Sequence, residues 1–200
     1  MCEISSDFGP FVEMTPEPKL YPLVYNYLAT QFLVARKPMY GDANIIIDEV
    51  SHVVPAADGP WARMDLAAVC VERHRFSAAA SIDTISFEVK THAGADLASV
   101  HEALAHRRFA RSSFLVWNRP ACICNDRKNY ERIEQSCKLH GVGLITAHDP
   151  NRTHTYQIRI IAQSAGQTDA ANAEFIHERF SQNSQTRITQ EIQRLNKAAL

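Results

Sequence analysis

Hydrophobic positions in the first half of the chain predict a helix followed by three strands. In residues 17–33 the apolar side chains recur every three or four positions, as on one face of a helix. The two prolines of this segment lie in its opening turns, where a helix tolerates them. Residues 44–54 are rich in β-branched side chains, and residues 63–73 form a largely apolar run. Residues 82–90 alternate between apolar and polar positions, as a strand with one buried face does.

The second half alternates between helical and strand-like segments. A helical pattern covers residues 95–110, where Asp96 can cap the first turn. A second covers residues 125–141, where Gly141 suits the position just after the helix. Strand-like segments follow at residues 112–118, 142–148 and 153–162.

This order predicts an α/β fold with a mixed central β-sheet flanked by helices. We expect residues 1–16 to form a flexible N-terminal arm and residues 17–163 to form the main domain. Residues 164–200 would form a linker and a C-terminal helix, with the helix over residues 173–197. The scattered apolar positions of that helix could pack on the sheet or against a second copy of the chain.

Composition narrows the class of protein. The chain has 200 residues, of which 46% are hydrophobic, enough for one domain with a substantial core. Its formal net charge of -1 does not support a general nucleic-acid or membrane surface, so an anionic partner would need a local basic patch. The five cysteines, the lack of a secretory signal and the lack of a long apolar run predict a cytoplasmic protein with no membrane partner.

The strand at residues 82–90 carries two charges on its polar face, Glu88 and Lys90. Asp65 is a lone acid in the apolar strand before it. If the two strands form a hairpin, Asp65 and Glu88 become cross-strand neighbours, with Lys90 further along the same face. Two carboxylates suit Mg²⁺ or Mn²⁺, and the carbonyl of Val89 could add a third oxygen. A metal there would lower the pKa of a bound water, which Lys90 could orient or help deprotonate.

An aspartate, then Glu-x-Lys on the next strand, then a helix and a strand, resembles the PD-(D/E)XK nuclease superfamily. The resemblance spans roughly residues 17–147. It is carried by the segments LYPLVYNYL, DLAAV, FEVK, DLASVHEAL and HGVGLIT. It implies a restriction-endonuclease-like core of order αβββαβ with a C-terminal helical extension, similar to an uncharacterised bacterial group in that superfamily.

The resemblance also implies an activity. The protein would be an endonuclease that uses Mg²⁺ or Mn²⁺ to hydrolyse phosphodiester bonds, in DNA rather than RNA. Asp65, Glu88 and Lys90 would be its catalytic residues. The metal would be held by Asp65, Glu88 and Val89, joined by Glu17 from the first helix. Members of the family often carry a glutamine on the helix after the lysine, where this chain has Glu102. That acid could serve a second metal or form a salt bridge.

Three basic residues could contact nucleic acid. His101, Arg107 and Arg108 lie on and just after the helix that follows Lys90. They could form a phosphate-contacting ridge, because arginine binds phosphate through two hydrogen bonds. They could equally form a solvated helix end, where cations are favoured by the helix dipole. Enzymes that cut both strands of a duplex are often two-fold dimers, so a homodimer through the C-terminal helix is a further hypothesis.

Other interpretations of the sequence stay open. Glu-x-Lys is also a common surface pair that contributes little. The near-neutral charge and Glu102 favour a second hypothesis, a nuclease-fold module that binds nucleic acid or a protein partner without cutting. A third hypothesis is a zinc site, since Cys122, Cys124, Cys137 and His140 have suitable spacing. These cysteines could equally be ordinary core or surface residues.

Overall fold

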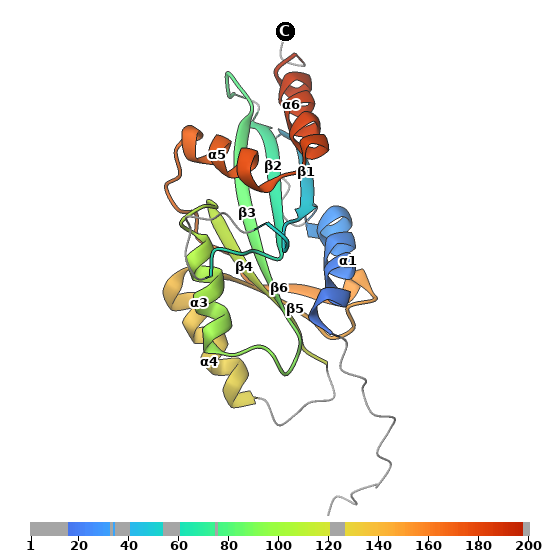
Figure 1. Cartoon of the computed structure of the whole chain (residues 1–200), viewed down its shortest axis with the longest axis vertical. Coiled ribbons are helices and arrows are strands. Elements are labelled where there is room, and N and C mark those ends of the chain that lie inside the picture. Colours follow the sequence, from blue (N-terminus) through green and yellow to red (C-terminus); the bar gives the residue numbers. More distant parts are fainter. Residues whose placement is uncertain are drawn as a thin grey trace, which may run out of the picture.

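The computed structural model describes residues 16–32, 34, 41–53, 61–74, 76–120 and 127–197, apart from the side chains of residues 41 and 42. The helices are α1 (Glu17–Tyr27), α3 (Leu97–His106), α4 (Arg127–His140), α5 (Asp169–Arg179) and α6 (Gln182–Lys197), with a π-helical turn η1 (Leu28–Phe32) and a 3-10 turn η3 (Thr153–Thr155). The strands are β1 (Gly41–Glu49), β2 (Leu66–His74), β3 (Ser81–Lys90), β4 (Ser112–Asn118), β5 (Gly143–Ala147) and β6 (Tyr156–Ile160) (Figure 1).

The strands form one mixed six-stranded sheet, in the order β1-β2-β3-β4-β5-β6. Strands β1, β2 and β3 are antiparallel, β3, β4 and β5 are parallel, and β6 returns antiparallel to β5. The two parallel connections pass through α3 and α4, as parallel strands require a crossover. The predicted α/β fold, a mixed sheet flanked by helices, is therefore confirmed.

One face of the sheet packs against α1 and η1. Alternation of side chains along each strand directs Phe87 and Phe114 to this face, where both contact Phe32 of η1. The ring centroid of Phe32 lies 5.5 Å from that of Phe87 and 5.4 Å from that of Phe114. These edge-to-face pairs hold η1 against β3 and β4. Helix α1, which leads into η1, has its first turn near the end of β3, where Oε2 of Glu17 lies 3.7 Å from Nζ of Lys90.

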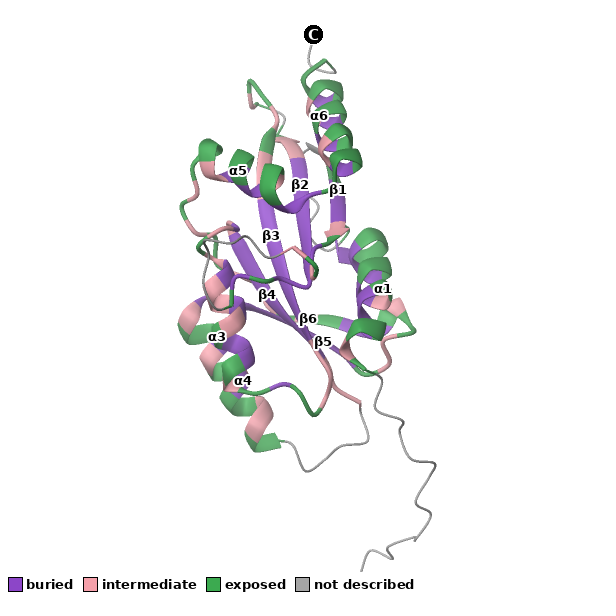
Figure 2. Ribbon diagram, viewed as in Figure 1, coloured by how far each residue is buried: buried purple, intermediate pink, exposed green. Residues whose placement is uncertain are grey.

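The opposite face is covered by two pairs of helices, so the sheet is buried on both sides (Figure 2). Helices α3 and α4 pack on β4 and β5 around Trp117, Ile133 and Leu144. Helix α6 packs on β1 and β2, and α5 packs on β3, through side chains that include Ile188 and Phe175. Each strand therefore has apolar residues on both faces, and a buried acid such as Glu88 is exceptional in them.

The predicted helix ends agree with the structure at two places. The carboxylate of Asp96 accepts a hydrogen bond of 3.0 Å from the amide of Ser99 and caps α3. Gly141 follows α4 with a φ of 67°, a left-handed conformation that favours glycine.

The single C-terminal helix predicted over residues 173–197 is wrong. The segment forms two helices, because Phe180 is extended and the hydroxyl of Ser181 caps the next helix at the amide of Ser184. Asp48 at the end of β1 fixes this break, accepting hydrogen bonds from the amide of Ser181 at 2.8 Å and the hydroxyl of Ser184 at 2.6 Å. The break depends on a contact with a distant strand, which helical periodicity does not contain.

The apolar stripe of α6 packs within the same chain. Ile188 and Leu195 are buried against β1 and β2. The homodimer through this helix stays a prediction. Residues 1–15 of the expected N-terminal arm lie outside the described residues. Within the described part of the chain, no helix combines the length and apolar character needed to cross a bilayer.

Candidate functional site

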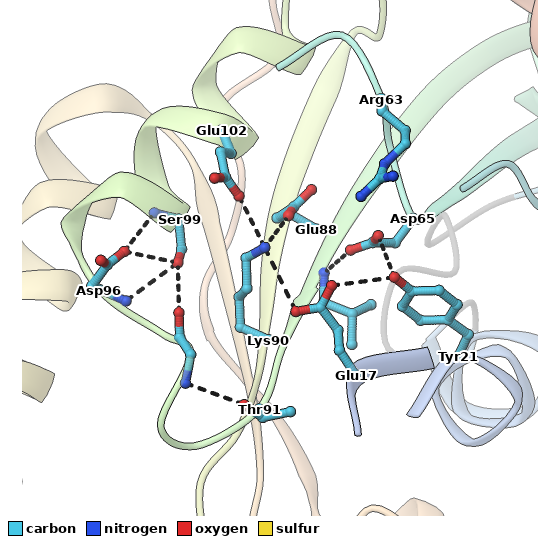
Figure 3. A network of polar contacts seen from close by, with 12 residues as sticks. Glu17, Tyr21, Arg63, Asp65, Glu88, Lys90, Thr91, Asp96, Ser99 and Glu102 are labelled. Atoms are coloured by element: carbon cyan, nitrogen blue, oxygen red, sulfur yellow. Dashed lines mark hydrogen bonds and ion pairs between the residues drawn. The ribbon is translucent and has the colours of Figure 1, made fainter. Parts of the chain in front are cut away.

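The hairpin of β2 and β3 brings Asp65 and Glu88 together. Leu66 lies opposite Phe87, so the next pair along the antiparallel strands is Asp65 and Glu88. This is the register that the sequence predicts. Since β2 begins at Leu66, Asp65 stands just beyond the ladder, where its side chain can turn toward the backbone of β3 (Figure 3).

The carboxylate of Asp65 is only 3% exposed, and both of its oxygens accept hydrogen bonds. The hydroxyl of Tyr21 donates to Oδ1 at 2.6 Å, and the amide of Val89 donates to Oδ2 at 2.7 Å. Burial raises the pKa of Asp65, although the hydrogen bonds from Tyr21 and Val89 oppose that effect. The site thus holds a carboxylate in a fixed orientation at the end of the strand.

Lys90 joins three carboxylates from three elements. Its Nζ lies 2.6 Å from Oε1 of Glu88, 2.9 Å from Oε2 of Glu102 on α3 and 3.7 Å from Oε2 of Glu17 on α1 (Figure 3). Burial acts to lower the pKa of Lys90, but the charge of Glu88 and the hydrogen bonds to Glu88 and Glu102 outweigh it and raise that pKa. Lys90 is therefore an ammonium at neutral pH. It can orient a water or offset negative charge, but it cannot accept a proton.

Glu88 is also buried, with 5% of its surface exposed. Burial and the neighbouring charge of Asp65 raise its pKa well above the usual range, against the influence of Lys90. For Glu102, partial burial acts to raise the pKa, but hydrogen bonds with Glu88 and Lys90 outweigh it and lower that pKa. Four acids thus surround one ammonium, and the raised pKa of Glu88 means that a further cation nearby would stabilise its charged form.

Two residues at the site, Tyr21 and Arg63, are not among those singled out from the sequence. Tyr21 contacts Glu17 as well as Asp65, with 3.2 Å between its hydroxyl and Oε1 of Glu17. Glu17 and Tyr21 are four residues apart on one helix, and this spacing in the sequence indicates that their side chains are neighbours. Arg63, two residues before Asp65, extends its side chain toward the carboxylates of Asp65 and Glu88 (Figure 3).

A further residue at the site is His106, one of the basic residues of the helix after Lys90, and it is fully buried. Its Nε2 lies 3.0 Å from the carbonyl oxygen of Arg63 and 3.7 Å from Oε2 of Glu88. Burial lowers the pKa of His106 to about 4, so the ring is neutral at pH 7. Because a carbonyl only accepts, Nε2 carries the proton and donates it to Arg63. His106 therefore anchors the backbone that leads into Asp65.

The predicted phosphate-contacting residues lie apart from this group. Arg107, at the end of α3, donates from Nη1 to the carbonyl of His140. Arg108 donates from Nε to the carbonyl of Ala105 at 3.1 Å. The ring of His101 lies 5.5 Å from that of His140 on α4. These contacts join α3 to α4 or to itself, and a role for the three residues on nucleic acid stays a prediction.

The zinc hypothesis is only partly within the described residues, because Cys122 and Cys124 lie outside them. Cys137 is fully buried in the core beneath α4. Burial raises the pKa of its thiol to about 12, so it is not a thiolate at neutral pH. Cys137 is thus an ordinary core residue in this structure, and His140 faces His101.

The donor set near Lys90 has the chemistry that a hard divalent cation requires. Asp65 and Glu88 are the residues that would hold Mg²⁺ or Mn²⁺, and Glu17 and Glu102 lie at the rim of the same group. When bound, such an ion would lower the pKa of a water and stabilise negative charge on a phosphate. Among the described residues, no three acidic, histidine or cysteine side chains are already arranged around a metal position. Lys90 provides the positive charge that the acids contact here.

Comparisons with known proteins identify no family. No family model matches the chain. No curated protein matches it either. A solved structure that resembles it is the SPO1766 protein of unknown function from Silicibacter pomeroyi. That protein is 14% identical, the match covers 88% of this chain and 91% of that chain, and the TM-score is 0.43. A likeness of this degree carries no information on activity.

Proposed function

We propose that this protein is a divalent-metal-dependent nuclease of the PD-(D/E)XK type, which hydrolyses phosphodiester bonds in DNA. One observation carries the proposal. The acids Asp65 and Glu88 and the ammonium of Lys90 meet at the end of a β-hairpin, although 25 positions separate the first from the last. The element order α1-β1-β2-β3-α3-β4 supports the proposal, because it is the αβββαβ order of a restriction-endonuclease-like core.

Each residue has a role in the proposed reaction. Asp65 and Glu88 hold the cation, and the hydrogen bonds from Tyr21 and Val89 fix the orientation of Asp65. Lys90 stays protonated, so it orients the attacking water and offsets charge on the phosphate. When bound, the cation would lower the pKa of that water, and its proton would pass to solvent. Without a cation, the negative charge of the carboxylates would repel a phosphate anion.

The test is cleavage of plasmid, linear and single-stranded DNA by the purified chain, with Mg²⁺, with Mn²⁺ and with a chelator. We expect cleavage only with a metal, and a loss of at least about 100-fold in Glu88→Gln and in Lys90→Ala. Lys138→Ala is a matched control, because its Nζ makes an exposed 3.3 Å ion pair with Glu134 on α4. Circular dichroism would verify that each variant is folded. Intact DNA with every metal, from a folded wild-type chain, would reject the proposal.

A second function is favoured by the contacts of Lys90 itself. Its ammonium already contacts the carboxyl groups of Glu88 and Glu102, where a cation would have to bind, as in a module that binds without cutting. Calorimetry with Mg²⁺ separates the two functions. For a nuclease we expect a measurable heat of Mg²⁺ binding that is absent in Glu88→Gln. For a binding module we expect no heat of Mg²⁺ binding, although the protein still binds DNA.

A further inference from the structure

A polar cavity lies at the carboxyl ends of β4 and β5, away from the acidic group formed by Glu17, Asp65, Glu88 and Glu102. Its volume is about 160 Å³, below the ~300 Å³ at which pockets for drug-sized ligands begin. The residues that line it include Arg119, His148 and Arg159 and the polar side chains of Thr146 and Gln157. None of the described residues that line it is acidic. A small cavity whose described lining has two guanidinium groups and no carboxylate is suited to a compact anion.

The two arginines are held in place by the surrounding elements. The Nε of Arg159 donates to the hydroxyl of Thr146 at 3.2 Å, which orients its guanidinium over β5. The amide of Arg119 donates to the carbonyl of Ala147 at 2.7 Å. The guanidinium carbon of Arg119 lies 4.7 Å from the ring centroid of Tyr130 on α4. Ordering of this kind lowers the entropic cost of binding a ligand between them.

The cavity lies on the same face of the sheet as Glu88 and Lys90. Lys90 is paired with Trp117, Trp117 with Thr146, and Thr146 with Gln157. Paired residues on neighbouring strands share a face, so this row runs from the acidic group to the cavity. Three strand spacings correspond to about 14 Å. Along the helix axis of B-form DNA, that distance spans about four base pairs, at ~3.4 Å each.

We infer that this cavity binds a phosphate group of a nucleic acid whose backbone also reaches Lys90. The inference rests on the proposed function for the identity of the ligand. Arg119 and Arg159 bind the phosphate oxygens, and the hydroxyl of Thr146 keeps Arg159 in position. The substrate backbone then crosses the carboxyl ends of β3, β4 and β5. The phosphate is either an internal one or the terminal one of a cut strand, since both present the same oxygens.

The test compares Arg159→Gln with Arg152→Gln, by anisotropy of a labelled short DNA duplex at several salt concentrations. Arg152 is the matched control, because it lies outside the cavity and pairs with Asp149 at 3.3 Å while 69% exposed. We expect Arg159→Gln to weaken binding about five- to tenfold at low salt and to reduce the salt slope by about one. We expect Arg152→Gln to behave as wild type. Equal behaviour of the two variants would overturn the inference.

Two further arms separate the sources of phosphate and the two proposals. Tighter binding of a 5′-phosphorylated duplex, lost in Arg159→Gln, assigns the cavity to a terminal phosphate, and equal binding assigns it to an internal one. Inorganic phosphate is then titrated while amide NMR signals of Thr146 and Gln157 are followed. If the wild-type chain neither binds nor cuts DNA, but phosphate shifts these signals and the shifts vanish in Arg159→Gln, the nuclease proposal is rejected and the anion site is retained. If the wild-type chain cuts DNA, phosphate causes no shifts, and Arg159→Gln binds DNA as tightly as wild type, only the anion site is rejected.

Discussion

The hydroxyl of Tyr21 donates a 2.6 Å hydrogen bond to Oδ1 of Asp65, across 44 positions of the chain. This bond ties α1 to the start of β2, and it acts on a carboxylate that burial would otherwise destabilise. The first helix therefore does more than cover the sheet. It orients the acid on which the proposed chemistry depends.

The first prediction concerns this hydrogen bond. Tyr21→Phe should lower the free energy of unfolding at neutral pH by about 1.5–3 kcal/mol, because a buried carboxylate loses a donor. Urea denaturation measures the change. Tyr25→Phe is the control, since Tyr25 lies one turn further along α1 and is 38% exposed. A loss of the same size in both variants would show that the Tyr21 hydroxyl contributes nothing specific.

The second prediction concerns His106 and acid. Its pKa of about 4 in the folded chain lies below the ~6.5 of an unfolded histidine. A depressed pKa contributes stability that is present above pH ~6.5 and is lost as the pH falls through ~4. The difference corresponds to about 3 kcal/mol.

Denaturation between those pH values should therefore show a shallower loss of stability in His106→Gln than in the wild-type chain. The glutamine amide can still donate to the carbonyl of Arg63, which preserves the neutral contact. His101→Gln, on the outer face of α3, should retain the full wild-type slope. Parallel curves for His106→Gln and wild type would contradict the prediction.

The third prediction has the opposite sign, because burial and Asp65 raise the pKa of Glu88. A raised pKa contributes stability that is present below the usual value near ~4.3 and is lost as the pH rises through the folded value. In chelator, Glu88→Gln should thus melt at a higher temperature than wild type at pH ~8. The gain should shrink as the pH falls toward ~4. Glu134→Gln on α4 is the control. A lower melting temperature for Glu88→Gln at alkaline pH would count against it.

The fourth prediction tests the affinity of the acids for a cation without measuring cleavage. Lys90→Met leaves Glu17, Glu88 and Glu102 without their shared ammonium, so its melting temperature should fall in chelator. Millimolar Mg²⁺ should restore part of that loss, because a ligand that binds the folded state stabilises it. The gain with Mg²⁺ should exceed that of wild type and of Lys138→Met. Equal gains in all three proteins would mean that these acids do not select a divalent cation.

Local pattern was sufficient for much of this architecture. Alternation along residues 82–90 put Glu88 and Lys90 on one face, and counting back through the turn paired Asp65 with Glu88, as the register of β2 and β3 confirms. Short-range rules also located the cap at Asp96 and the left-handed Gly141. These features depend on residues close in sequence or on a single hairpin, so the chain carries them in its own periodicity.

Other features required the packed molecule. The break between α5 and α6 depends on Asp48 of β1, and the orientation of Asp65 depends on Tyr21 of α1. The anchoring of Arg63 depends on His106, which lies 43 residues away. Each of these is a polar contact between elements that meet only because their apolar faces are buried together. Hydrophobic periodicity shows that an element has a buried face, but it does not say which distant polar group that face will meet.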